Sequence, residues 1–196
     1  LSAENDQVKL DQIPQAQSSL ISFNPKTGEV LSYVGGSVFN DSQFDRVRQS
    51  YPQSGSVFKP FIYASAFSGG YNPSSLINDA PIIFEDENLE TFWRPENYSG
   101  KFYGLTTLRE ALVQSINIVS IKLLREIGIK KSSETVDNFG FGIERLPQDL
   151  SLALGSGNFS PAEVARGFSV FANGGMISDI HYVSQIKDKN GDIIFD

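Results

Sequence analysis

The feature that most constrains the fold of this chain is a proline inside an apolar segment, Pro60 in "SGSVFKPFIYASAF" at residues 54–67. Proline lacks a backbone N–H and its ring collides with the preceding turn, so an α-helix accepts it only in its first turn. The apolar run continues from Val57 and reaches Gly69-Gly70, and glycine is typical of a helix end. The sequence therefore predicts a buried helix that begins close to Ser56.

Ser56 and Lys59 are three positions apart at the start of this helix. That spacing places both side chains on one face, so we expect the Lys59 amine within hydrogen-bonding reach of the Ser56 hydroxyl. Free backbone N–H groups and the helix dipole at this end could hold an oxyanion. Desolvation by Phe58, Pro60 and Phe61 favours a neutral amine that can accept a proton. The pattern indicates a nucleophile and its base, but a capping serine beside a solvated lysine explains the same residues.

The composition argues against several other kinds of site. The chain has no cysteine, which excludes thiol nucleophiles, disulfides and cysteine metal sites. Its single histidine, His181, lies in an expected strand without a partner motif, and we interpret it as structural. The net charge is −7 and basic residues do not cluster, so nucleic acid is not an expected partner. No run of about 18 apolar residues is present that would span a membrane.

Capping patterns predict two further helices. Thr107 and Glu110 precede a segment with apolar residues at helical spacing, which Gly128 is placed to end. The next helix begins in "SPAE" at residues 160–163, where serine caps, proline takes the first helical position and glutamate completes a second capping box. We expect one helix over residues 107–127 and another over 160–173.

Strand signals flank these helices at both ends of the chain. Residues 18–36 contain two β-rich runs around an Asn-Pro-Lys-Thr-Gly turn, and residues 181–196 form a hairpin pattern at Asn190-Gly191. Residues 71–105 are rich in proline, asparagine and aromatics and are expected to be irregular. Strand pairs at both ends with helices between them predict an α+β domain with helices packed on a mostly antiparallel sheet.

Three short motifs together are the signature of penicillin-recognising serine enzymes. They occur here as Ser-x-x-Lys at 56–59 and 184–187, Ser-x-Asn at 22–24, 115–117 and 156–158, and Lys-Thr-Gly at 26–28. Residues 184–187 are expected in a strand, where a three-residue step points the two side chains to opposite faces. Residues 26–28 are expected to form a solvent-facing hairpin turn remote from Ser56. None of these motifs is specific by itself.

The wider sequence resembles class A, bifunctional penicillin-binding proteins, whose nucleophile segment usually reads Gln-Pro-Gly-Ser-x-Phe-Lys-Pro-Phe. The segment here is "QSGSVFKPF". The resemblance covers about residues 8–196, and the other segments that carry it follow in the family's order: "LISFNPKTGEVLSYVGG", "FDRVRQ", "WRPENYSGKFYGLTTLREALVQSINIVSIKLLREIGI", "LALGSGNFSPAEVARGFSVFANGG" and "KDKNGDIIFD". "LDQIPQAQSSL" resembles the junction in Gram-negative, 1A-type members where an inserted β domain meets the transpeptidase.

The resemblance assigns a role to each of four residues. Ser56 corresponds to the acylated serine and Lys59 to its general base. Ser115 corresponds to a proton relay and Asn117 to a substrate-binding amide that also holds Lys59. On this basis we expect Ser115 and Asn117 to face Ser56, whereas residues 22–24 and 156–158 are chance matches.

The resemblance also predicts the fold and its extent. It implies an α+β, penicillin-binding-protein/β-lactamase-like transpeptidase fold for residues 18–196, preceded by a linker or the end of an inserted β domain at residues 1–17. The family's Lys-Thr-Gly follows its second motif, so we expect the true third motif beyond Asp196 and a domain incomplete at its C-terminus. We therefore expect residues 1–196 alone not to form a competent acylating site. Ser54 replaces a common proline, which is expected to loosen the turn without affecting the chemistry.

The function that the resemblance implies is peptidoglycan D,D-transpeptidation. Its partners would be stem peptides ending in D-Ala-D-Ala, β-lactam antibiotics, and the remainder of the transpeptidase domain, which a separate chain could carry. No metal or organic cofactor is implied. The parent protein would act at the periplasmic face of the inner membrane, anchored by an N-terminal segment outside this sequence, and would also carry a glycosyltransferase domain.

Two alternatives share these sequence features. A serine β-lactamase uses the same nucleophile with an added water-activating carboxylate, for which Glu144 and Glu163 are the candidates. A non-catalytic penicillin-recognising sensor or binding domain would keep the fold without the chemistry. The lifetime of a penicillin adduct distinguishes a β-lactamase, which releases it quickly, from a transpeptidase, which keeps it. Loss of function on Ser56→Ala argues against a non-catalytic domain.

Overall fold

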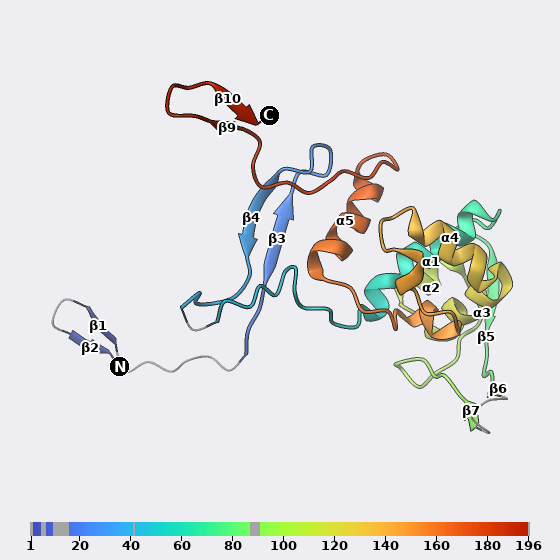
Figure 1. Ribbon diagram of the computed structural model, residues 1–196. Helices are drawn as coiled ribbons and strands as arrows, with labels where there is room; N and C mark the ends of the chain where they lie inside the picture. The colour runs from blue at the N-terminus through green and yellow to red at the C-terminus, as the bar shows by residue number, and fades with distance from the viewer. Residues whose placement is uncertain (1, 5–6, 10–15, 41, 87–90, 196) are drawn as a thin grey trace.

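The computed structural model describes residues 2–4, 7–9, 16–40, 42–86 and 91–195. Figure 1 shows a helical body made by α1 to α4, with α5 between this body and the β3–β4 hairpin. The described helices are α1 (Lys59–Ser68), α2 (Leu108–Val113), α3 (Asn117–Ile127), α4 (Ile129–Asp137) and α5 (Pro161–Ala172), with 3-10 turns η1 (Gly55–Phe58), η2 (Ile143–Arg145) and η3 (Leu150–Leu154). Across the described residues, no helix is both long and apolar enough to cross a bilayer.

The described strands pair antiparallel in twos. The pairs are β1 (Ser2–Glu4) with β2 (Gln7–Lys9), β3 (Leu20–Phe23) with β4 (Val30–Val34), β5 (Leu76–Asp79) with β8 (Gly104–Thr107), β6 (Phe84–Asp86) with β7 (Thr91–Trp93), and β9 (Ile186–Lys187) with β10 (Ile193–Phe195). Helices and antiparallel strands are both present, as the α+β prediction requires. The β1–β2 pair lies within the expected linker, and residues 10–15 of that linker lie outside the described residues.

The β3–β4 hairpin confirms the turn predicted at residues 26–28. The Gly28 N–H donates to the Asn24 carbonyl at 2.8 Å, and Gly28 has a φ of +81°. A Cβ at Gly28 would lie 1.9 Å from the carbonyl oxygen of Asp179, so only glycine fits there. The Lys26 and Thr27 side chains are exposed. The only Lys-Thr-Gly in the sequence is therefore a turn packed against the chain near Asp179.

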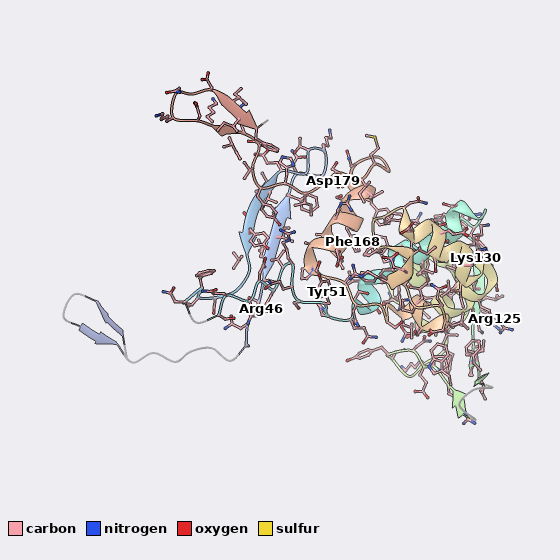
Figure 2. The ribbon with its side chains drawn as sticks, viewed as in Figure 1. Arg46, Tyr51, Arg125, Lys130, Phe168 and Asp179 are labelled. Carbon is pink, nitrogen blue, oxygen red and sulfur yellow. The ribbon has the colours of Figure 1, made fainter. Side chains whose placement is uncertain are left out.

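The helix predicted from Pro60 lies at the centre of the hydrophobic core. Gly55 opens a 3-10 turn that continues directly into α1, which Gly69 ends. Phe58 and Phe61 are 1% and 0% exposed, and their rings contact Phe141. Phe168 of α5, labelled in Figure 2, also packs its ring edge-on against that of Phe61 at a centroid distance of 5.0 Å. Residues of α3 and α4 belong to the same core cluster as Phe58 and Phe61, so α1 packs against several parts of the domain.

Two predictions for the middle of the chain are wrong. Residues 107–127 do not form one helix, because the chain breaks at Ser115, whose φ is +53°, and α3 starts anew at Asn117. Residues 71–105 are not wholly irregular, since they contain the short pairs β5–β8 and β6–β7. The caps were predicted correctly: the Thr107 hydroxyl accepts from the Glu110 N–H, and α5 has its full capping box.

Phe61 provides a test of the core. In the native protein that carries this sequence, Phe61→Ala is expected to lower the free energy of unfolding by about 3–5 kcal/mol, because a cavity forms among five contacting rings. Phe67→Ala is the matched control on α1, since Phe67 is 38% exposed and packs on the Tyr63 ring, and its loss should be smaller, about 1–2 kcal/mol. Urea unfolding measures both, and equal losses would contradict this description of the core.

Candidate active site

Ser56 lies in the first turn of the η1–α1 helical segment and its side chain is exposed. The Gly55 N–H donates to the Gly155 carbonyl at 2.9 Å, and the Ser56 carbonyl accepts from the Lys59 N–H. Backbone N–H groups in a first turn have no acceptor within the helix. The local structure therefore presents the Ser56 hydroxyl to solvent beside backbone donors.

Lys59 is buried, with 1% of its surface exposed, although its side chain ends in an amine. Its Nζ donates to the Ser115 carbonyl at 2.7 Å, the Ser115 hydroxyl at 3.1 Å and the Asn117 Oδ1 at 2.7 Å. Burial lowers the pKa of the Lys59 amine to about 8. The site thus contains an amine that loses its proton far more easily than a lysine in water.

The predicted hydrogen bond between Ser56 and Lys59 is not formed in the described structure. Helical spacing places the two residues on one face, but all of the amine's described hydrogen bonds lead to Ser115 and Asn117. Three N–H donors of an ammonium group match these three acceptors, so a protonated Lys59 has no donor left for Ser56. The resemblance correctly placed Lys59 beside Asn117, whereas the hydrogen bond to Ser56 that helical spacing predicted is absent.

Ser115 has a backbone conformation that is unusual for a residue other than glycine. Its φ of +53° lies in the left-handed region, which costs free energy for a residue with a side chain. This residue joins α2 to α3, and both its carbonyl and its hydroxyl accept from Lys59. The left-handed turn is what allows one residue to offer two acceptors to the same amine.

Asn117 is the first residue of α3 and connects Lys59 to a second layer of polar groups. Its Oδ1 accepts from Lys59 while its Nδ2 donates to the Glu96 carbonyl at 2.9 Å. The preceding residue, Ile116, has no side-chain oxygen to cap α3. The Oδ1 of Asn97 replaces that cap, because it accepts from the N–H groups of Asn117 at 3.0 Å and Ile118 at 3.1 Å.

Asn97 is itself fixed by a buried carboxylate. Its Nδ2 lies 2.9 and 3.0 Å from the two oxygens of Asp79, which is 1% exposed and also accepts from the Tyr103 N–H. Sequence reasoning missed Asp79 and Asn97, since no spacing rule links these residues to each other or to Asn117. The only available indication was that Asn97 belongs to the polar and aromatic segment "WRPENYSG".

The remaining motif matches are engaged elsewhere. Ser156 contacts the hydroxyl of Ser151, and Asn158 forms a backbone bridge with Gln53, so neither binds Lys59. Residues 156–158 nevertheless pair with the chain just before Ser56, a proximity that the sequence did not indicate. Lys187 lies in β9 and is exposed, as expected of a chance match.

Neither candidate for a water-activating carboxylate contacts Ser56 or Lys59 in the described structure. Glu163 completes the capping box of α5 with Ser160 and pairs with Arg145. Burial would raise its pKa, but the hydrogen bonds from Arg145 and Ser160 outweigh burial and lower it. The Glu144 side chain is exposed.

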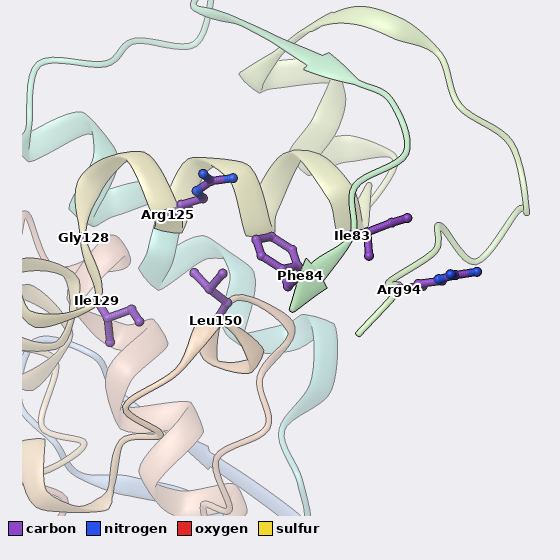
Figure 3. Close-up of a pocket in the computed structure, with 7 residues that line it drawn as sticks. All are labelled: Ile83, Phe84, Arg94, Arg125, Gly128, Ile129 and Leu150. Carbon is purple, nitrogen blue, oxygen red and sulfur yellow. The ribbon is translucent and has the colours of Figure 1, made fainter. Parts of the chain in front are cut away.

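A pocket at the other end of α3 contains none of these residues. It has a volume of about 790 Å³ and lies beside Phe84, Arg94, Arg125 and Ile129 (Figure 3). Arg125 and Ile129 belong to the last turn of α3 and the first turn of α4, whereas Asn117 begins α3. The candidate active site is therefore distinct from this pocket.

The chain is similar to known proteins over nearly its whole length. The family model described as the penicillin binding protein transpeptidase domain matches residues 19–194. Penicillin-binding protein 1A of Pseudomonas aeruginosa is 44% identical over 192 residues, covering 98% of this chain and 23% of the relative. Penicillin-binding protein 1A of Escherichia coli is 40% identical over 187 residues, covering 95% of this chain and 22% of the relative. The chain thus spans less than a quarter of these curated relatives.

Solved structures show the same likeness. The crystal structure of penicillin-binding protein 1A from Haemophilus influenzae matches with a TM-score of 0.90 and 37% identity, covering 95% of this chain and 28% of that one. The PonA1 protein from Mycobacterium tuberculosis in complex with penicillin V matches with a TM-score of 0.79 and 20% identity, covering 93% of this chain and 51% of that one.

Asn97 provides a test of the second layer. Asn97→Ala is expected to lower the free energy of unfolding by about 2–3 kcal/mol, because it removes the Asn97 donor from the buried Asp79 carboxylate and the acceptor from the Asn117 and Ile118 N–H groups. Asn138→Ala is the control, since exposed Asn138 only donates to the Glu134 carbonyl and should cost less than about 0.5 kcal/mol. A loss at Asn97 no larger than the control's in urea unfolding would show that the network adds little.

Proposed function

This chain belongs to the penicillin-binding protein transpeptidase family, and from that premise we propose that it carries the nucleophile of a peptidoglycan D,D-transpeptidase. Ser56 is the nucleophile, Lys59 the general base, Ser115 the proton relay and Asn117 the substrate-binding amide. One observation carries the proposal. The Lys59 amine, with a pKa of about 8, is buried one turn after the exposed Ser56 and is hydrogen-bonded to Ser115 and Asn117.

The lowered pKa makes Lys59 a usable base. At a given neutral pH, the fall from 10.5 to about 8 raises the neutral fraction of the amine by roughly 300-fold. A neutral amine has two N–H donors and one lone pair, so it can keep its two 2.7 Å bonds and release the longer contact to the Ser115 hydroxyl. The lone pair can then accept the Ser56 proton, in a hydrogen bond of a kind that often forms only in the substrate complex.

The proposed reaction transfers an acyl group in two steps. Ser56 Oγ attacks the carbonyl between the two terminal D-alanines of a stem peptide while its proton passes to Lys59. Backbone N–H groups of the first turn stabilise the oxyanion. The carbon–nitrogen bond then breaks, and the proton passes through Ser115 to the leaving D-alanine, which gives an ester on Ser56. The amine of a second stem peptide then attacks the ester carbonyl and forms a new amide bond. The bond between the carbonyl carbon and Ser56 Oγ breaks, and the amine's proton passes through Lys59 to Ser56 Oγ.

Several features of the whole protein belong to the same proposal. A β-lactam mimics the D-Ala-D-Ala unit and acylates Ser56 instead of substrate, in keeping with the penicillin V complex of the PonA1 protein. Because Lys26-Thr27-Gly28 is a turn, the groups that bind the substrate carboxylate come from the remainder of the transpeptidase domain. The protein acts at the periplasmic face of the inner membrane, where its peptidoglycan substrate lies.

Intact mass spectrometry tests the proposal. The native protein that carries residues 1–196 is expected to form a stoichiometric, long-lived adduct with benzylpenicillin that maps to Ser56. Ser56→Ala should abolish the adduct because it removes the proposed nucleophile, whereas the Ser115 hydroxyl, which also contacts Lys59, is the proposed proton relay. Ser184→Ala is the matched control in the other Ser-x-x-Lys and should leave the adduct unchanged.

The alternatives give different results in the same experiment. An adduct that disappears within the mixing time, with hydrolysed penicillin accumulating, would indicate a β-lactamase. A protein that binds stem peptide but forms no adduct would be a non-catalytic binding domain. Either result would contradict the transpeptidase proposal.

A further inference from the structure

Ser54, two residues before Ser56, forms hydrogen bonds that neither motif reasoning nor the reaction above requires. Its hydroxyl donates to the carbonyls of Gly155 and Gly157, each at 3.2 Å, sharing one proton between two acceptors. Its backbone N–H donates to the Gly157 carbonyl at 3.1 Å. Ser54 therefore ties the chain that leads into the nucleophile to a segment about 100 residues away.

These bonds belong to a short antiparallel pairing between residues 52–55 and 155–159. Gln53 and Asn158 form an antiparallel bridge, and the Phe159 N–H donates to the Pro52 carbonyl at 3.2 Å. The two backbones are in direct contact, because a Cβ at Gly155 would lie only 2.0 Å from the Gly55 carbonyl oxygen. The turn before Ser56 is thus in direct backbone contact with residues 155–159, with no side chain between them.

The second segment is firmly attached to the core. It follows η3, in which Leu152 and Ala153 are fully buried, and the Gly155 N–H donates to the Leu152 carbonyl at 3.0 Å. By contrast, Gly55 has a φ of +58° and open space where a Cβ would be. Glycine restricts backbone rotation least of all residues, so the turn depends on its neighbours for a fixed shape.

The direction of the Ser54 hydroxyl has a second consequence. Ser54 occupies the N-cap position of η1, where a serine oxygen ordinarily accepts from the N–H two or three residues on, which here would be Ser56 or Val57. Ser54 makes no such capping hydrogen bond, because its hydroxyl is turned to Gly155 and Gly157. The Ser56 N–H is the group that a developing oxyanion needs, and this arrangement leaves it without a side-chain acceptor.

We propose that Ser54 is a positioning residue for acylation: its hydroxyl anchors the turn before Ser56 to residues 155–157 and keeps the Ser56 N–H uncapped. The inference rests on the proposed function, because it concerns the geometry of an attack by Ser56. If Ser54 has this role, the rate constant of acylation depends on the hydrogen-bonding groups of the side chain at position 54. The dissociation constant of the β-lactam, which describes initial binding, does not depend on them.

Three substitutions at position 54 separate the two parts of this role. Ser54→Thr keeps the hydroxyl donor and should acylate like the wild type. Ser54→Ala removes the anchor and should slow acylation about tenfold. Ser54→Asp cannot donate to carbonyls and is a strong N-cap residue, so it should occupy first-turn N–H groups and slow acylation about a hundredfold.

The experiment measures stopped-flow acylation by nitrocefin or benzylpenicillin in the native protein, resolved into a dissociation constant and a rate constant, with thermal unfolding of each variant. The expected result is a fall in the rate constant in the order threonine, alanine, aspartate, with dissociation constants unchanged. Ser156→Ala is the matched control on the partner segment and should behave like the wild type, since its hydroxyl contacts Ser151 instead of the turn.

Two outcomes would overturn the inference alone while wild type still acylates on Ser56. One is an acylation rate constant for Ser54→Ala within twofold of wild type. The other is a slower acylation of the Ser54 variants that is explained entirely by a larger dissociation constant or by a smaller fraction of folded protein. A wild type without an adduct on Ser56 would overturn the proposed function, and this inference with it.

Discussion

The hydrogen bonds between the buried Lys59 amine and the loop at Ser115 are the interactions on which the rest of the site depends. A lysine with 1% of its surface exposed is unfavourable as an ammonium ion unless acceptors surround it. Ser115 and Asn117 supply those acceptors, and the left-handed turn at Ser115 follows from placing two of them at one residue. Burial lowers the pKa of Lys59, so the unfolded chain binds more protons between pH 8 and pH 10.5. The free energy of unfolding should therefore rise with pH across that window. At lower pH, the buried amine makes the fold less stable than a solvated lysine would.

Two sets of hydrogen bonds fix the positions of Ser56 and Lys59 relative to each other. On one side, Asp79 fixes Asn97, which caps α3 and thereby sets the position of Asn117. On the other side, the pairing of residues 52–55 with 155–159 sets the turn before Ser56. Both sets are made by polar groups between segments distant in sequence. A serine and a lysine on one helical turn are thus positioned by parts of the chain on either side of them.

The parts of the fold that the sequence predicted correctly are those decided by neighbouring residues. Pro60 restricts where its helix can begin, and the Ser160 capping box defines the start of α5. The break at Ser115 was missed because its neighbours favour a continuous helix, and the distant Lys59 stabilises the turn instead. The cap from Asn97 was missed for the same reason, since its partners are about 20 residues away. Ser54 was expected to loosen its turn and instead anchors it, which only the position of Gly155 and Gly157 could reveal.

Lys59 is expected to be a base of lowered pKa before any substrate binds. The most direct test is an NMR titration of the Lys59 side chain in the native protein with ¹³C-labelled lysine, following the Cε signal from pH 6 to pH 11. Its assignment comes from the signal that disappears in Lys59→Arg. A buried Lys59 is expected to give a transition near pH 8. A Lys59 transition at the ordinary lysine value near 10.5 would contradict it.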